Sequence, residues 1–189
     1  MRVDVDSRGR TSRSSRSRPR WRCCCWVGDV NSPATRMHEI SFNPGTNPAW
    51  MLTEVRESHI HGLGLFARVA IPKGTVWWHG RREDVMLLEK LQYETLARSE
   101  RSTLIEQTLE AILMYSYYTR ESDALIVCLD NSRFVNHSIA ANSGALPSAD
   151  PLSSVALRDI AAGEEIVENY LDYARCPWAD LRWEFVQSD

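Results

Sequence analysis

A row of hydrogen-bonding side chains follows a short apolar segment in the second half of the chain. The apolar segment, residues 125–129, is short enough for a buried strand, and Asn136, His137 and Ser138 come soon after it, within residues 130–142. A buried amide or imidazole without a partner costs on the order of 1–3 kcal/mol. The stretch is therefore either a loop that fastens its own backbone or a site that binds a polar ligand.

A glycine-containing segment is a second candidate for binding. Residues 58–67 read SHIHGLGLFA, with Gly62, Leu63, Gly64 and Leu65 in succession. Glycine has no Cβ, so the chain can turn sharply there and a ligand can approach the backbone closely. The segment is either a hairpin with nothing bound or the bed of a ligand.

Histidine spacing raises a metal-dependent hydrolase as an alternative. His59 and His61 would present two imidazoles on one side of a strand, which zinc accepts, and His79 and His137 could add to them. No carboxylate partner stands at a matching position, so we expect no metal site. The five cysteines form neither a paired framework nor a CxxC spacing, which disfavours structural zinc and a disulfide scaffold and favours a reducing compartment.

Three ordered motifs together resemble the SET-domain methyltransferases. Residues 133–142, RFVNHSIAAN, are similar to the RFxNHSxxxN signature of that family. Residues 62–67 with the IPKGT of residues 71–75 resemble its opening, and residues 163–170, GEEIVENY, resemble its GEELxxxY. The resemblance covers roughly residues 50–173 and implies a mostly β fold with an α insert (α+β), built of short strands in small curved sheets with a pseudoknot.

The resemblance also implies a function and a set of site residues. The function is S-adenosylmethionine-dependent methyl transfer to a lysine side chain of a protein or peptide. Tyr170 would be the catalytic tyrosine, and Tyr115 or Tyr117 would line the lysine channel, since the two alternate to one side of a strand while Tyr118 faces away. The residues expected to hold the cofactor are Gly62, Leu63, Gly64, Leu65, Asn136 and His137. The residues expected only to support them are Arg133, Phe134 and Asn142.

The chain departs from the family pattern at the substrate channel. Trp78 stands where relatives usually have a tyrosine, and Glu168 stands where a phenylalanine or tyrosine often sets the degree of methylation. The cysteine cluster that follows many SET domains is absent, and we expect Trp178 and its aromatic neighbours to close the channel by packing. These departures leave a second function open, a catalytically inactive SET-like module that binds protein.

Composition divides the chain into unequal parts. Residues 1–36 hold nine arginines and three aspartates and are rich in serine, so they are either a disordered tail or a mis-called start. Residues 37–189 hold 13 basic and 22 acidic residues, which suits a cationic, lysine-bearing partner and makes nucleic acid unlikely except through the tail. No apolar run reaches the length of a membrane span, so a soluble intracellular protein, cytoplasmic or nuclear, is expected.

Helical patterns fall between the motifs. The apolar spacing predicts one helix over residues 81–98 and a second from Thr103, where Thr103 and Glu106 form a capping-box pattern. Together they make a helical insert over residues 81–114 of a SET-like domain at 50–173. Residues 174–189 form a C-terminal aromatic segment.

Overall fold

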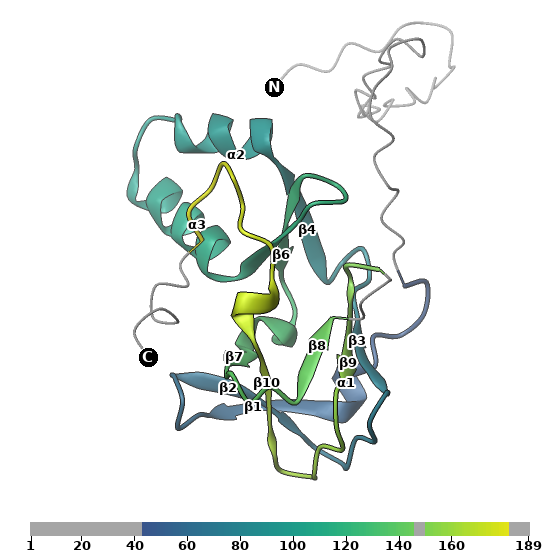
Figure 1. Cartoon of the computed structure of the whole chain (residues 1–189). Helices are drawn as coiled ribbons and strands as arrows, with labels where there is room; N and C mark the ends of the chain where they lie inside the picture. Colours follow the sequence, from purple (N-terminus) through teal and green to yellow (C-terminus); the bar gives the residue numbers. More distant parts are fainter. Residues whose placement is uncertain (1–42, 146–149, 182–189) are drawn as a thin grey trace, which may run out of the picture. The chain divides into compact units, whose positions relative to one another are not determined.

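Strand β6 (Ala124–Cys128) is buried on both faces and joins the two halves of the fold (Figure 1). In the computed structural model, which describes residues 43–145 and 150–181, all of its side chains are buried. Ile126 packs in the main hydrophobic core, while Leu125 and Val127, on the other face, pack in a second core beneath the helices. A run of apolar and β-branched residues suits such a strand because neither face meets water. The strand predicted from residues 125–129 is confirmed.

The larger sheet carries the three sequence motifs. Its strands lie in the order β1 (Thr53–Glu57), β2 (Leu63–Ala67), β10 (Glu165–Glu168), β8 (Ser143–Ala145), β9 (Ser153–Ala156) and β3 (Val76–His79), and β7 (Asn136–His137) also pairs with β10. Strand β10 therefore lies between the glycine motif on one side and the Asn-His-Ser motif on the other.

The helical insert is shorter than the sequence suggested. Residues 81–89 do not begin a helix; β4 (Val85–Glu89) pairs antiparallel with β6 along its whole length, and β5 (Ser116–Thr119) pairs with the other edge of β6. The apolar spacing fitted either element, and pairing with a buried strand decided the outcome. Helix α2 (Lys90–Ala97) starts where Glu89 and Gln92 form a capping box.

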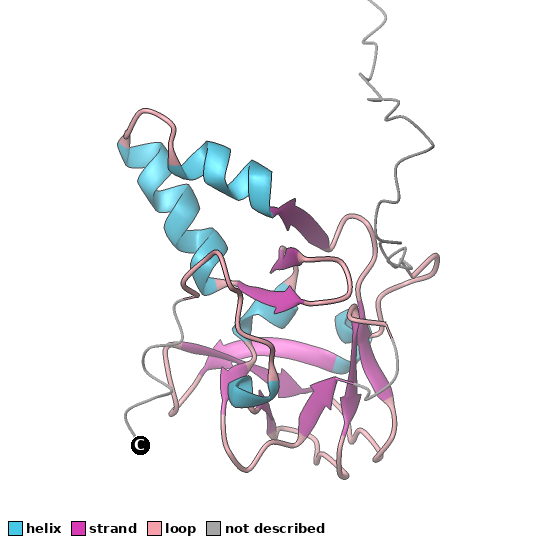
Figure 2. Cartoon of the chain, turned by 45° about the horizontal axis from the view of Figure 1, so that its top comes forward, coloured by secondary structure: helices cyan, strands magenta, loops and turns pink. Residues whose placement is uncertain are grey.

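The second helix, α3 (Thr103–Met114), begins as predicted, but its cap is Ser102, whose hydroxyl accepts the Ile105 N–H at 3.3 Å. The two helices are joined by a short loop and stand away from the strands of the larger sheet (Figure 2). Of the helices within residues 43–145 and 150–181, none has the length and apolar content to cross a bilayer.

A buried polar network ties the start of the described chain to this core. The Asn47 side-chain amide donates to Asp84 at 2.9 Å and to Asp130 at 2.8 Å, and the Trp78 indole N–H donates to Asp130 at 2.8 Å. The guanidinium of Arg81 in turn donates twice to Asp84, at 2.8 and 2.9 Å. Short elements complete the domain: α1 (Ala49–Leu52) and the 3-10 turns η1 (Asn131–Phe134) and η2 (Tyr170–Asp172).

The predicted fold class, mostly β with an α insert and short strands in small curved sheets, is confirmed. The predicted tail at residues 1–36 lies outside the described residues, as does the end of the predicted C-terminal segment.

Candidate active site

Strand β10 brings the three motifs together. It runs parallel to β7, with Val167 opposite Asn136 and Glu168 opposite His137, and antiparallel to β2, with Ile166 opposite Leu65. The two remote segments 136–138 and 165–170 therefore meet side by side, as expected from the resemblance.

Asn142 fastens this junction from the side. Its side-chain oxygen accepts the Val167 N–H at 2.9 Å, and its amide donates to the Glu165 carbonyl at 2.7 Å. It is almost completely buried. These contacts agree with the supporting role expected of it.

Asn136 holds the glycine segment against β10. Its side-chain amide donates to the carbonyls of His61 and Leu63, at 3.2 and 3.1 Å, and to Glu165 at 2.8 Å. Glu165 also accepts from the Ser58 hydroxyl, at 2.8 Å. Hydrogen bonds therefore fix the glycine segment at Ser58 and on both sides of Gly62.

The two glycines of this segment serve different purposes. Gly64 is buried, and a Cβ there would come within 2.2 Å of the Glu165 carboxylate, so its small size permits the close approach. Gly62 has a φ of +46°, which L side chains rarely adopt, and no atom lies within 4 Å of where its Cβ would be. The backbone at Gly62 therefore faces open space.

Tyr170 sits against the Asn-His-Ser segment. Its backbone N–H donates to His137 Nδ1 at 3.1 Å, the two rings lie 5.4 Å apart, and its hydroxyl donates to the Val135 carbonyl. Burial, with a smaller contribution from the charge of Glu168, raises the pKa of Tyr170 above its usual value. The phenol is therefore neutral at pH 7.

A second group of aromatic side chains surrounds Glu168. The Tyr117 and Tyr173 rings lie 5.3 Å apart, and the Tyr173 hydroxyl donates to Glu168 Oε2. The Ser143 hydroxyl donates to Glu168 Oε1 at 2.7 Å. Two residues expected at the channel, Tyr117 and Glu168, therefore lie close together, with Tyr173 between them. Glu168 is also only two residues before Tyr170 in the sequence.

Three other residues expected at the channel lie apart from this group. Tyr115 is not in the strand with Tyr117; it caps α3, and its ring meets Phe134 edge-on at 6.4 Å. It lines an open groove of about 560 Å³ between α3, β6 and η1. The alternation expected of Tyr115 and Tyr117 is wrong because β5 starts only at Ser116.

The two tryptophans expected at the channel both have structural partners. Trp78 is buried in the main core, and its N–H is taken by Asp130. Trp178 packs beside Tyr93 and Tyr118, on the face of β5 opposite Tyr117, and donates to Asp123 at 2.9 Å.

The four histidines considered as metal ligands do not form a metal-binding cluster. Within residues 43–145 and 150–181, no three side chains of histidine, cysteine, aspartate or glutamate lie close enough together to hold a metal ion. His79 instead pairs with Asp150, with 2.7 Å between Nε2 and Oδ2.

Comparison with protein families identifies the fold that carries this junction. The SET domain model matches residues 62–171, which is more than half of the chain and runs from the glycine segment to just beyond Tyr170. The chain belongs to the SET-domain family.

Solved SET-domain proteins are similar to this chain at low identity. The Chaetomium thermophilum Polycomb Repressive Complex 2 in an autoinhibited conformation bound to S-adenosylmethionine matches with 22% identity and a TM-score of 0.47, over 66% of this chain and 16% of that one. A Plasmodium falciparum protein described as a candidate histone methyltransferase matches with 16% identity and a TM-score of 0.40, over 62% of this chain and 91% of that one. No curated protein matches. The chain spans only about 15% of the first of the solved chains it matches.

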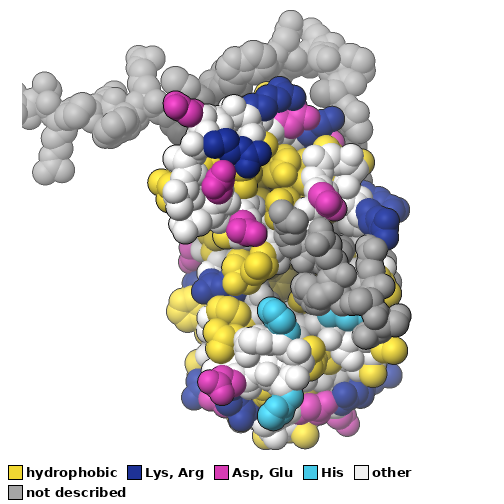
Figure 3. All heavy atoms as spheres, turned by 90° about the vertical axis from the view of Figure 1, so that its left-hand side faces the viewer, with side chains coloured by type: hydrophobic (Ala, Val, Ile, Leu, Met, Phe, Trp, Pro, Cys, Tyr) yellow, Lys and Arg dark blue, Asp and Glu magenta, His cyan; other side chains and the backbone are white. Residues whose placement is uncertain are grey.

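S-adenosylmethionine is the cofactor of the SET-domain methyltransferases, and the residues present fit it. The space over Gly62 is open, which leaves room for a ligand against the backbone. His137 is half-buried, and Leu63 is exposed. Histidine and hydrophobic side chains share one face of the molecule in the space-filling view (Figure 3). Gly62, Leu63, Asn136 and His137 would hold the cofactor here. Gly64 and Leu65 were expected to hold it as well, but both are buried, Gly64 against Glu165 and Leu65 in the main core.

Reasoning from the sequence missed two members of this SET domain's site. Tyr173, three residues after Tyr170, donates its hydroxyl hydrogen to Glu168. Ser143 follows directly on the Asn-His-Ser motif and is not part of it, but it is buried and bridges Trp77 and Glu168.

Proposed function

We propose that the chain is an S-adenosylmethionine-dependent protein-lysine N-methyltransferase. The observation that supports this most is the contact of the Tyr170 hydroxyl with the Val135 carbonyl, directly beside Asn136 and His137. It provides two fixed oxygen atoms next to the segment proposed to hold the cofactor.

Methyl transfer to lysine makes three demands on the protein. The amine must be neutral when it attacks, it must lie in line with the methyl carbon, and water must be excluded. A lysine in water has a pKa of about 10.4, so an apolar channel helps by disfavouring the charged form. The bound cofactor supplies an electrophilic methyl group on a sulfonium.

The described residues meet these demands in specific ways. The Tyr170 hydroxyl is neutral and donates to Val135, so its oxygen keeps a lone pair to accept an N–H of the amine and so orient it. The Tyr170 and Val135 oxygens can also make C–H···O contacts with a methyl group, each weak but well aimed. The rings of Tyr117 and Tyr173 form an apolar wall for the lysine chain.

The substrate is proposed to be a lysine in a protein or peptide. The acidic composition of residues 37–189 favours basic segments as partners. An intracellular location, in cytoplasm or nucleus, is part of the proposal because the cofactor is an intracellular metabolite.

Incubation with methyl-labelled cofactor and a peptide array tests the proposal, with Tyr170→Phe as the key variant. The wild type should label lysine peptides. Tyr170→Phe keeps the ring and loses one hydroxyl, so turnover should fall by at least about a hundredfold, as is usual when an orienting group is removed. Turnover by the variant equal to that of the wild type would refute the role given to Tyr170.

An inactive SET-like binding module is the second candidate, favoured by two observations. A buried carboxylate, Glu168, stands at an expected aromatic position, and the N–H of Trp78 is already used by Asp130. Titration calorimetry separates the two candidates, because a silent titration with S-adenosylmethionine would favour the binding module.

A further inference from the structure

Glu168 is a buried carboxylate that lacks a cationic partner. Only 6% of it is exposed, and its two oxygens accept from the hydroxyls of Ser143 and Tyr173. Among the ion pairs of residues 43–145 and 150–181, none involves Glu168. Burying a charge is costly unless an opposite charge or strong hydrogen bonds compensate it.

The hydroxyl of Ser143 is oriented toward this carboxylate. Its oxygen accepts the Trp77 indole N–H at 2.7 Å, which leaves its own hydrogen for Glu168. Trp77 is almost fully buried, so this orientation is fixed by the core. The carboxylate is therefore held in place from the direction of β8.

Four titratable side chains whose pKa is affected by the charge of Glu168 add no positive charge around it. They are Tyr117 of β5, Cys128 of β6, Tyr170 of η2, and Tyr173, which follows η2. Burial, and to a smaller extent the charge of Glu168, raises the pKa of each, to about 12 for Cys128. All four are neutral at pH 7. Asp130 and Asp150 add negative charge near Tyr117.

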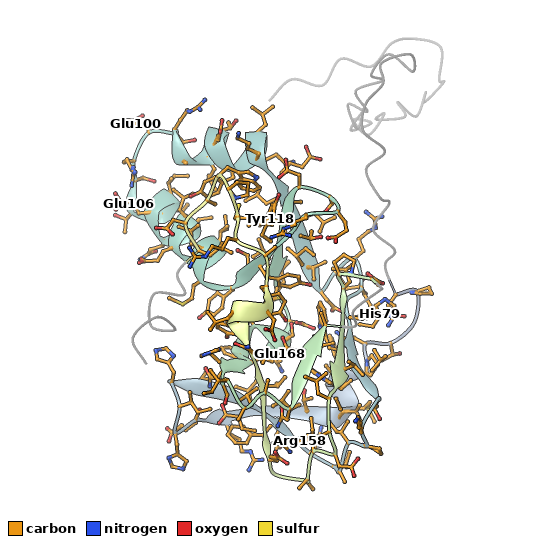
Figure 4. The ribbon with its side chains drawn as sticks, viewed as in Figure 1. His79, Glu100, Glu106, Tyr118, Arg158 and Glu168 are labelled. Carbon is orange, nitrogen blue, oxygen red and sulfur yellow. The ribbon has the colours of Figure 1, made fainter. Side chains whose placement is uncertain are left out.

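The place of Glu168 in the fold is next to the proposed reaction centre. It is the last residue of β10 (Figure 4). Its Oε2 accepts from Tyr173, whose ring lies 5.3 Å from that of Tyr117. Its backbone lies opposite His137, and Tyr170 follows two residues later. A lysine ammonium group that reached the edge of this ring pair would therefore lie beside the carboxylate.

We propose that the Glu168 carboxylate binds the ammonium group of the substrate lysine and selects for less methylated lysine. This inference rests on the proposed function. An unmethylated lysine ammonium has three N–H donors, and each added methyl removes one. Trimethyllysine can offer the carboxylate no N–H, so it binds more weakly.

The same contact predicts a pH effect. A neighbouring negative charge favours the charged form of an amine and so raises the pKa of the bound lysine. Because only the neutral amine attacks, kcat rises with pH through that pKa. Removing the charge of Glu168 should therefore shift the acid limb of the kcat profile to lower pH.

Glu168→Gln tests the inference, with Glu54→Gln on the half-exposed face of β1 as the matched control. The probe is the best-labelled peptide of the array, with its target lysine unmethylated or trimethylated, bound to protein loaded with S-adenosylhomocysteine. The wild type should prefer the unmethylated peptide by about tenfold or more. Glu168→Gln should lose that preference and show the shifted acid limb, while Glu54→Gln keeps both wild-type properties.

Unchanged preference in Glu168→Gln would overturn the inference while leaving the proposed function standing. A wild type that binds no S-adenosylmethionine and labels no peptide would instead refute the proposed function. Should Glu168→Gln fail to fold, Glu168→Asp replaces it in the test: it keeps the charge but draws the carboxylate back by one methylene, so the preference for the unmethylated peptide must fall, and an unchanged preference would overturn the inference.

Discussion

Asp84 is a single buried side chain on which several hydrogen bonds of this domain depend. It accepts from Asn47 and, three times, from Arg81, once from its backbone N–H and twice from its guanidinium. Burial favours the neutral acid, but these hydrogen bonds and the charge of Arg81 outweigh it and hold the pKa of Asp84 below its usual value.

Asp84→Asn should therefore destabilise the protein by on the order of 2–3 kcal/mol at pH 7. A depressed pKa gives stability that is present above the unfolded value of 3.8 and is lost as pH falls through the folded value. The difference from the wild type should shrink below about pH 4. Urea unfolding of both proteins at pH 7 and near pH 3 measures it, and a constant difference would contradict the assignment.

Individual residues also mark the limit of sequence reasoning. The sequence motifs predicted that Tyr170 would lie near Asn136 and His137, because the resemblance to the SET family implied that their two segments meet. The pairing of β7 with β10 agrees with this. Tyr115 and Tyr117 could not be separated, because the choice depends on where α3 ends and β5 begins, which packing on β6 decides. The partners of Trp78 were equally invisible, since Asp130 is far away in the sequence.

The glycine segment is the element whose exact path matters most for the site. Gly64 lets β2 approach Glu165, which in turn accepts from Asn136 at 2.8 Å. A side chain at this position would push the Glu165 carboxylate away and break its hydrogen bonds with Asn136 and Ser58.

Gly64→Ala should lower the affinity for S-adenosylmethionine by about tenfold or more, because the cofactor bed loses its shape. Gly144→Ala in β8 is a matched control, since the nearest atom to its new Cβ would be Leu157 Cδ1 at an ordinary 3.4 Å. Titration calorimetry of both variants measures the effect. Equal affinities in Gly64→Ala and the wild type would show that the bed tolerates the displacement.

Across the whole domain, two hydrophobic cores share β6 but serve different ends. The main core supports the proposed site, while the second holds the helices and the described part of the C-terminal segment, with Trp178 against Tyr118. The helix predicted at residues 81–98 was wrong in its first half, because residues 85–89 form β4 and pair with β6. The helix α2 begins only at Lys90.

Trp178→Ala should lower stability by about 3 kcal/mol through lost packing and leave the KM for peptide unchanged. The expectation follows from its position on the face of β5 opposite Tyr117. Thermal unfolding and steady-state kinetics measure both quantities. A raised KM with little loss of stability would favour instead the earlier expectation that this segment closes the lysine channel.

The amide of Asn47 has a consequence for how the domain can be cut. It lies before the first residue of the family match, yet it supplies hydrogen bonds to two carboxylates inside that match. A fragment trimmed to residues 62–171 would lose these donors together with the whole of β1, the only strand on that side of β2 in the described chain. The family boundaries therefore delimit a shared pattern of residues, and the unit that folds independently must begin upstream of Asn47.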